Sequence, residues 1–175
     1  YYILLGISSG LVAAFVITVY AKETKIFSKI SNPWMKGLAG AVSFYFALLL
    51  FPALRGQGYA YVNALLNHDI SAFCGNSPLA FVFQSPYMFL VLVFMMIFLK
   101  AMASITCLET GADGGIFAPS MCIGAFLGYA VAQFLTLLNF PLGHEINASN
   151  FIVIGMGGVL AGVMHAPLTG IFLIA

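Results

Sequence analysis

Long apolar runs separated by short polar breaks dominate the first two thirds of this chain. Residues 1–21 contain no charged residue, and the runs at 36–51 and 86–108 contain one lysine each. A helix needs about 20 apolar residues to cross the ~30 Å hydrocarbon core of a bilayer. The pattern therefore predicts three long membrane helices, the first of which extends to about Ile30.

The last third of the chain predicts three more helices, two of which are short and interrupted by glycine and proline. These helices are expected at about 117–138, at about 150–163 and from Pro167 onward. Short, interrupted segments in membrane proteins often meet at a binding site in the middle of the bilayer. Polar loops are expected at 68–85 and 139–150, and a short amphipathic helix that ends near Asn67 precedes the first loop.

Composition supports a membrane protein. The 175 residues are 62% hydrophobic and only 6% charged, with a mean hydropathy of +1.07, whereas soluble domains carry about 25% charged residues. We expect an all-α, polytopic membrane protein of tilted and broken helices, with one partial transmembrane domain over 1–175 and no separate soluble domain. The chain lacks a starting methionine and stops within a helical pattern, so a longer protein is expected. A net charge of +1 gives no reason to expect nucleic acid.

Basic residues cluster after the first apolar run. Four of the six Lys and Arg residues fall there: Lys22, Lys25, Lys29 and Lys36. Because cytoplasmic loops carry an excess of basic residues, this turn is predicted to face the cytoplasm. Trp34 in the same turn fits an anchor at the membrane interface.

The stretch "GADGGIFAPS" at 111–120 interrupts two apolar helices. Its backbone groups would be unsatisfied in lipid, so it must line a cavity filled by protein or water. From Phe117 the pattern is helical, and Pro119 suits a first turn. The first amides, from about Gly115 to Ala118, lack partners within the helix and carry the positive end of its dipole. This arrangement predicts an anion site without a fixed cation, and an ordinary re-entrant turn with Gly/Pro breakers is an equal alternative.

Asp113 argues against the anion site, because a carboxylate beside bound anion repels it. Its side chain either caps the following helix or points to the aqueous side. Pairs of glycines four residues apart predict close helix packing. Gly124 with Gly128 and Gly158 with Gly162 follow the loop, and Gly6 with Gly10 lies in the first helix.

Three collinear segments resemble the CLC family of chloride channels and chloride/proton antiporters. "GADGGIFAPSMCIGAFLGYAVA" resembles the family's GxFxP signature, preceded by "KAMASITCLETG" and followed by "IGMGGVLAGVMHAPLTGIFLIA". "FPALRGQGYAYVNALL" resembles a further region of the same family. The resemblance covers most of the chain, chiefly the second inverted half of the membrane domain. Asp113 departs from the proline common at that position, which puts the local shape of the loop in doubt.

The resemblance implies chloride transport by a homodimer in the plasma membrane (the inner membrane in a prokaryote), with one pore in each subunit. Ile116 and Phe117 would then donate amide N–H groups to chloride. The residues that shape the loop would be Gly114, Gly115, Ala118 and Pro119. Lys100 would raise the positive potential near the pore, with snorkelling to the cytoplasmic interface as an equal alternative. Chloride is thus the expected transported ligand and the bilayer the expected surroundings, with no cofactor.

The family's motifs of GSGIP and GxEGP type, with the gating glutamate, are absent from these residues, as are its internal proton glutamate and late pore tyrosine. Protons as a second transported ion therefore stay open, and passive channel and proton-coupled exchanger are not separated. Two alternatives also remain: another class of transporter with broken helices, and a fragment that conducts nothing by itself.

An enzyme or a metal site is not expected. The sequence contains no HExxH, no G-x-S-x-G and no Cys/His spacing typical of zinc. The cysteines and histidines are scattered: Cys74, Cys107, Cys122, His68, His144 and His165. His165 is expected to face the protein interior. Glu109 is expected in an aqueous vestibule or paired with Lys100, and is a weaker candidate for a proton carrier.

Overall fold

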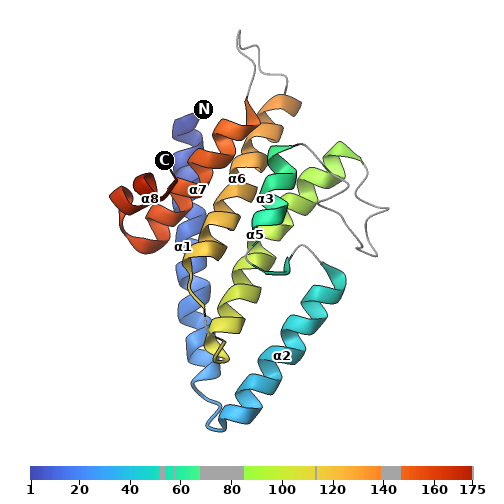
Figure 1. Cartoon of the computed structure of the whole chain (residues 1–175), viewed down its shortest axis with the longest axis vertical. Helices are drawn as coiled ribbons and strands as arrows, with labels where there is room; N and C mark the ends of the chain where they lie inside the picture. Colours follow the sequence, from blue (N-terminus) through green and yellow to red (C-terminus); the bar gives the residue numbers. More distant parts are fainter. Residues whose placement is uncertain (52–53, 57, 68–84, 113, 139–146, 175) are drawn as a thin grey trace.

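The computed structural model describes residues 1–51, 54–56, 58–67, 85–112, 114–138 and 147–174. Within these residues the chain is helical and contains no strand (Figure 1). The helices are α1 (Tyr2–Phe27), α2 (Pro33–Leu50), α3 (Tyr59–Leu66), α5 (Pro86–Glu109), α6 (Phe117–Leu137), α7 (Ala148–Met164) and α8 (Pro167–Ile174). The expected all-α fold class is confirmed.

Among the described residues, three helices are long and apolar enough to cross a membrane: α1, α5 from Tyr87, and α6. Helix α2, which corresponds to the predicted long membrane helix at 36–51, is not one of them. Together with the apolar composition, the three helices make this a multi-pass membrane protein, as predicted. The predicted helix bounds agree with the structure to within about three residues, the largest differences being the end of the first helix at Phe27 and the start of the second at Pro33. The predicted loop at 68–85 lies outside the described residues except at Ser85, and most of the loop at 139–150 lies outside them too.

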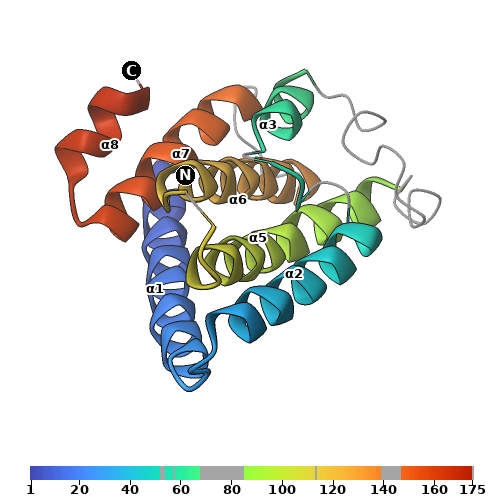
Figure 2. The same ribbon diagram turned by 60° about the horizontal axis from the view of Figure 1, so that its bottom comes forward.

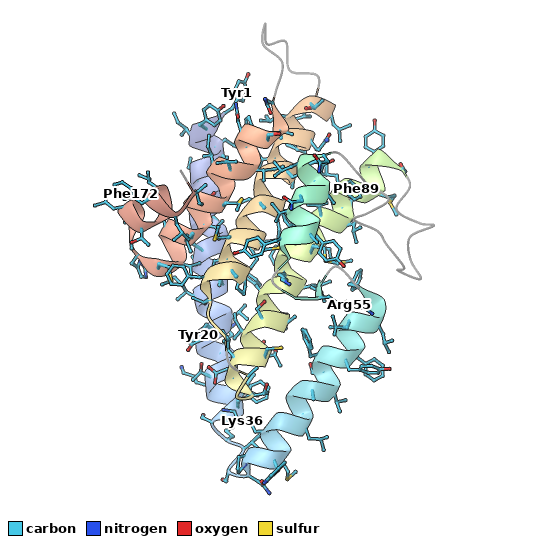
Figure 3. The ribbon with its side chains drawn as sticks, viewed as in Figure 1. Tyr1, Tyr20, Lys36, Arg55, Phe89 and Phe172 are labelled. Carbon is cyan, nitrogen blue, oxygen red and sulfur yellow. The ribbon has the colours of Figure 1, made fainter. Side chains whose placement is uncertain are left out.

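Local capping explains where two helices begin. Asn32 accepts a 3.0 Å hydrogen bond from the Trp34 amide, and Pro33 occupies the first position of α2. Asn147 accepts a 3.0 Å bond from the Ser149 amide and starts α7. Both are side-chain caps of the kind that asparagine provides at helix N-termini. The first cap fixes the short turn between α1 and α2, at the end of the molecule where Figure 3 labels Lys36.

Helix α6 is the central element of the molecule. It lies between α5 and α7 (Figure 2), and its residues from Cys122 to Ala132 are all buried. A Cβ added to Gly124 would lie 2.7 Å from the Met156 Cα, and one added to Gly128 would lie 2.8 Å from the Ile152 Cα. The absence of side chains here lets the backbones of α6 and α7 touch, as predicted for this glycine pair.

The other two glycine pairs differ in whether they contact a neighbouring helix. A Cβ on Gly158 would lie 2.9 Å from the Ser9 Oγ, and one on Gly162 would lie 2.6 Å from the Ala13 Cβ, so this pair packs α7 against α1. The prediction for Gly6 and Gly10 is wrong within the described residues, since nothing lies within 4 Å of a Cβ at either position. Ser9 and Ala13 form the small-residue face of α1 instead.

Candidate anion-binding site

The loop between α5 and α6 begins with a defined helix end. The Gly111 amide donates to the Leu108 carbonyl at 3.2 Å, and the Ala112 amide donates to the Cys107 carbonyl at 3.1 Å. Gly111 has a φ of +95°. This is the Schellman arrangement, in which a left-handed glycine ends a helix and satisfies its last carbonyls. It turns the chain sharply before the residues of the predicted site.

The start of α6 leaves backbone amides without a cap. Ile116 is the N-cap residue, and its side chain cannot accept a hydrogen bond. The Ser120 amide donates to the Ile116 carbonyl at 3.0 Å, and Pro119 has no N–H to satisfy. Among the described residues, no hydrogen bond reaches the amides of Phe117 or Ala118. These amides therefore lie at the positive end of the helix dipole and have no partner among the described residues.

The two glycines before Ile116 keep the approach to these amides open. Gly114 and Gly115 are exposed. A Cβ on Gly115 would meet only the Phe117 nitrogen, at 4.0 Å, and a Cβ on Gly114 would make an ordinary 3.5 Å contact with Leu108. A side chain at Gly115 would thus project beside the free amide. The expectation that Asp113 caps the helix concerns a residue outside the described part of the chain.

Lys100 is buried, with only 2% of its surface exposed. Its Nζ atom donates to the carbonyl oxygens of Leu54 at 2.9 Å and Gly56 at 2.7 Å. The snorkelling alternative for Lys100 is therefore wrong, because the ammonium group is held inside by two carbonyls. Within the described residues no carboxylate pairs with it, and its described partners are the two backbone carbonyls.

One cavity brings this lysine and the loop together. The cavity, which we call the Lys100 cavity, has a volume of about 440 Å³. Its wall includes residues of α2, of the segment before α3, of α5, of the loop and of the first turn of α6, among them Lys100, Ser104, Gly114, Gly115, Phe117, Ala118 and Pro119. The structure thus places the predicted electrostatic residue and most of the predicted loop residues on one cavity.

A second cavity, the His165 cavity, borders the same loop and measures about 640 Å³. Gly114, Gly115 and Ile116 form part of its wall, together with Tyr20 of α1 and His165. His165 is exposed, so the expectation that it faces the protein interior is wrong. The break between α7 and α8 turns it toward this cavity instead.

Glu109 does not pair with Lys100, so that one of its two expected positions is wrong; its position in an aqueous vestibule stays a prediction. Its Oε2 atom lies 4.0 Å from the Lys36 Nζ, and its Oε1 atom accepts a 2.8 Å hydrogen bond from the Thr24 hydroxyl. These contacts tie the end of α5 to the turn between α1 and α2. On the neighbouring turn of α1, buried Glu23 accepts a 2.8 Å bond from Thr106. Glu109 therefore belongs to the basic end of the molecule.

The sequence did not reveal that the backbone carbonyls of Leu54 and Gly56 bind Lys100, because this contact does not depend on the side chains of the two residues. Gly58 has a φ of +92°, and a Cβ there would collide with Cys122. The glycine lets the segment before α3 lie against α6 and brings these carbonyls to the lysine. Cys107 and Cys122 are free thiols. In the described part of the chain, no group of three His, Cys, Asp or Glu residues is arranged to hold a metal ion.

Comparisons with a family model and with curated proteins point to the same family. The model of the family described as voltage gated chloride channel matches residues 1–175, the whole chain. The chain is 29% identical over 178 residues to the H(+)/Cl(-) exchange transporter ClcA of Salmonella typhi, and 31% identical over 180 residues to the protein of that name in Cronobacter sakazakii. These alignments include 99% of this chain but only 33% and 34% of the relatives, so the chain spans about a third of their length. No solved structure matches it.

Proposed function

Because this chain belongs to the voltage gated chloride channel family, we propose that the full-length protein carries chloride across a membrane and that the loop before α6 binds it. The amides of Ile116 and Phe117 donate to the anion. Gly114, Gly115, Ala118 and Pro119 give the loop the shape that exposes them. The observation that carries this proposal is the uncapped start of α6, whose amides have no described partner.

Electrostatics favours a small anion at this place. The free amides and the helix dipole contribute partial positive charge, and Lys100 on the same cavity adds a full charge that no described carboxylate neutralises. Its ammonium is already bound to two carbonyls, so it acts by its field rather than by direct contact with the anion. An anion that is attracted but not paired to a fixed cation can leave again, as transport requires.

Proton-coupled exchange is the transport mode that we propose. Both relatives carry the name of H(+)/Cl(-) exchange transporters, and this support comes from their names alone. The sequence features that would separate an exchanger from a passive channel do not occur in these residues. Chloride and protons are thus the proposed transported ions, with no cofactor and no catalytic residue.

We propose a homodimer in the plasma membrane as the working assembly. Large hydrophobic side chains are exposed along α1 and α2 (Figure 3), among them Leu11, Trp34 and Phe46. Such side chains are covered by lipid or by protein in a membrane. The basic turn between α1 and α2 is proposed to face the cytoplasm.

Chloride efflux from proteoliposomes tests the function. Vesicles holding the full-length protein are loaded with chloride, and external chloride and pH are recorded together. An exchanger moves protons uphill as chloride leaves, whereas a channel moves chloride without them. Absence of chloride flux from a folded protein would overturn the proposal. The 175-residue chain measured in parallel tests the alternative that these residues conduct nothing by themselves.

A further inference from the structure

The His165 cavity contains an ionisable side chain that the proposed anion site does not use. The cavity shares Gly114 and Gly115 with the Lys100 cavity, so both cavities border the same loop. Ile116, one of the proposed amide donors, faces the His165 cavity. An anion in this cavity would therefore lie beside the loop that provides the proposed amide donors.

His165 is held at the cavity by its backbone. Its φ of +52° and ψ of 30° are left-handed, and it is the only non-glycine residue with positive φ in the part of the chain described here. Such a conformation costs free energy and persists only where the surroundings fix it. Here the His165 and Ala166 amides both donate to the Ala161 carbonyl, and Pro167 starts α8 directly afterwards. The imidazole is thus aimed from a rigid break between two helices.

Few other ionisable groups face this histidine. Helix α1 contributes Tyr20, which Figure 3 labels at the level of the loop, together with apolar Ile17. The end of α5, the loop and α7 contribute only apolar side chains and backbone among the described lining residues. Asp113 belongs to the same loop in sequence but lies outside the described residues. A charge on the imidazole would therefore meet no described carboxylate in the cavity.

We propose that protonated His165 binds the transported anion in the His165 cavity, as a station next to the amides of the loop. The ligand is a small inorganic anion such as chloride. Histidine is the side chain that gains and loses its charge between about pH 5 and 8. The protonated ring donates from both nitrogens and attracts an anion, whereas the neutral ring offers one donor and no charge. Anion affinity therefore rises as pH falls. This inference rests on the proposed function, because the ligand is the ion that the protein transports.

The test is calorimetric titration of chloride into purified full-length protein at about pH 5.5 and 7.5. The key variant is His165→Asn, because asparagine tolerates left-handed backbone and carries no charge. His165→Lys keeps a positive charge at both pH values. Asp113→Asn is the matched control for the other titratable residue of this region. Chloride efflux of the unmodified protein is measured alongside.

We expect the chloride Kd of the unmodified protein to be roughly tenfold lower at the acidic pH, the scale of a hydrogen bond to a charged group. His165→Asn should lose most of the change in Kd between the two pH values, with a Kd at the acidic pH close to that of the unmodified protein at the higher pH. His165→Lys should bind tightly at both. The proposal is overturned if the unmodified Kd does not change with pH, if His165→Asn keeps the change, or if Asp113→Asn alone removes it. The unmodified protein could bind chloride in a pH-dependent way that His165→Asn loses, and yet release no chloride in the efflux measurement. That result would support this site and refute the transport function.

Discussion

The Lys100 side chain donates a 2.7 Å hydrogen bond to the carbonyl oxygen of Gly56, which lies 44 positions earlier in the chain. With the second bond to Leu54, this contact ties α5 to the segment that precedes α3. The same lysine lines the cavity of the proposed anion site. Lys100 therefore joins two distant segments of the chain beside the proposed anion site.

Lys100→Met is predicted to weaken both stability and chloride binding. The variant leaves two carbonyls without their donor, and a buried unsatisfied group costs about 1–3 kcal/mol. We expect a clear loss of thermal stability in detergent and a higher chloride Kd. Lys100→Arg is the matched control, because it keeps charge and donors. If Lys100→Met matched the unmodified protein in both measurements, the two hydrogen bonds of Lys100 would not contribute to stability and its charge would not contribute to chloride binding.

Gly115→Val is predicted to raise the chloride Kd by about tenfold, which corresponds to 1.4 kcal/mol. The added side chain would project beside the free Phe117 amide, where a Cβ already reaches to 4.0 Å. Phe117→Ala should have a small effect, because it keeps the amide and removes only a side chain. Equal effects of the two substitutions, measured by calorimetry, would show that side chains rather than amides bind the anion.

Gly128→Ala is predicted to destabilise the protein, because its Cβ would lie 2.8 Å from the Ile152 Cα and closer still to the Phe151 backbone. Overpacking of this kind costs about 1–3 kcal/mol. Gly10→Ala is the control on another spanning helix, where nothing lies within 4 Å of the new Cβ. The two variants are compared by thermal unfolding in detergent. A greater loss of stability in Gly10→Ala would contradict the packing described for α6 and α7.

Glu109→Gln is predicted to leave chloride affinity unchanged and to alter stability only slightly. Its contact with Lys36 spans 4.0 Å and is partly exposed, and such ion pairs contribute about 0–1 kcal/mol. A double-mutant cycle with Lys36→Met, followed by thermal unfolding, measures the coupling. A coupling well above 1 kcal/mol, or a changed chloride affinity, would assign this pair a larger role.

The sequence predicts most of the helices, because hydrophobicity, glycine and proline act locally. The start of α6 at Phe117 and the start of α8 at Pro167 follow from this local chemistry. The candidate loop is also readable, since unpaired backbone between apolar helices must line a cavity.

Contacts between distant segments were not predictable in this way. The carbonyl partners of Lys100 belong to residues whose side chains play no part in the bond, so no residue pattern marks them. The pairing of Glu109 depends on the turn between α1 and α2 folding back beside the end of α5. The exposed position of His165 depends on its left-handed backbone conformation, which a histidine in the sequence does not by itself predict.

The most direct test of the central claim is to locate the anion itself. Crystals of the full-length protein grown in bromide give an anomalous signal at bound halide. We predict a peak within hydrogen-bonding distance of the Ile116 and Phe117 amide nitrogens. A halide peak that lies only elsewhere in the protein, with the amides occupied by other groups, would contradict the account.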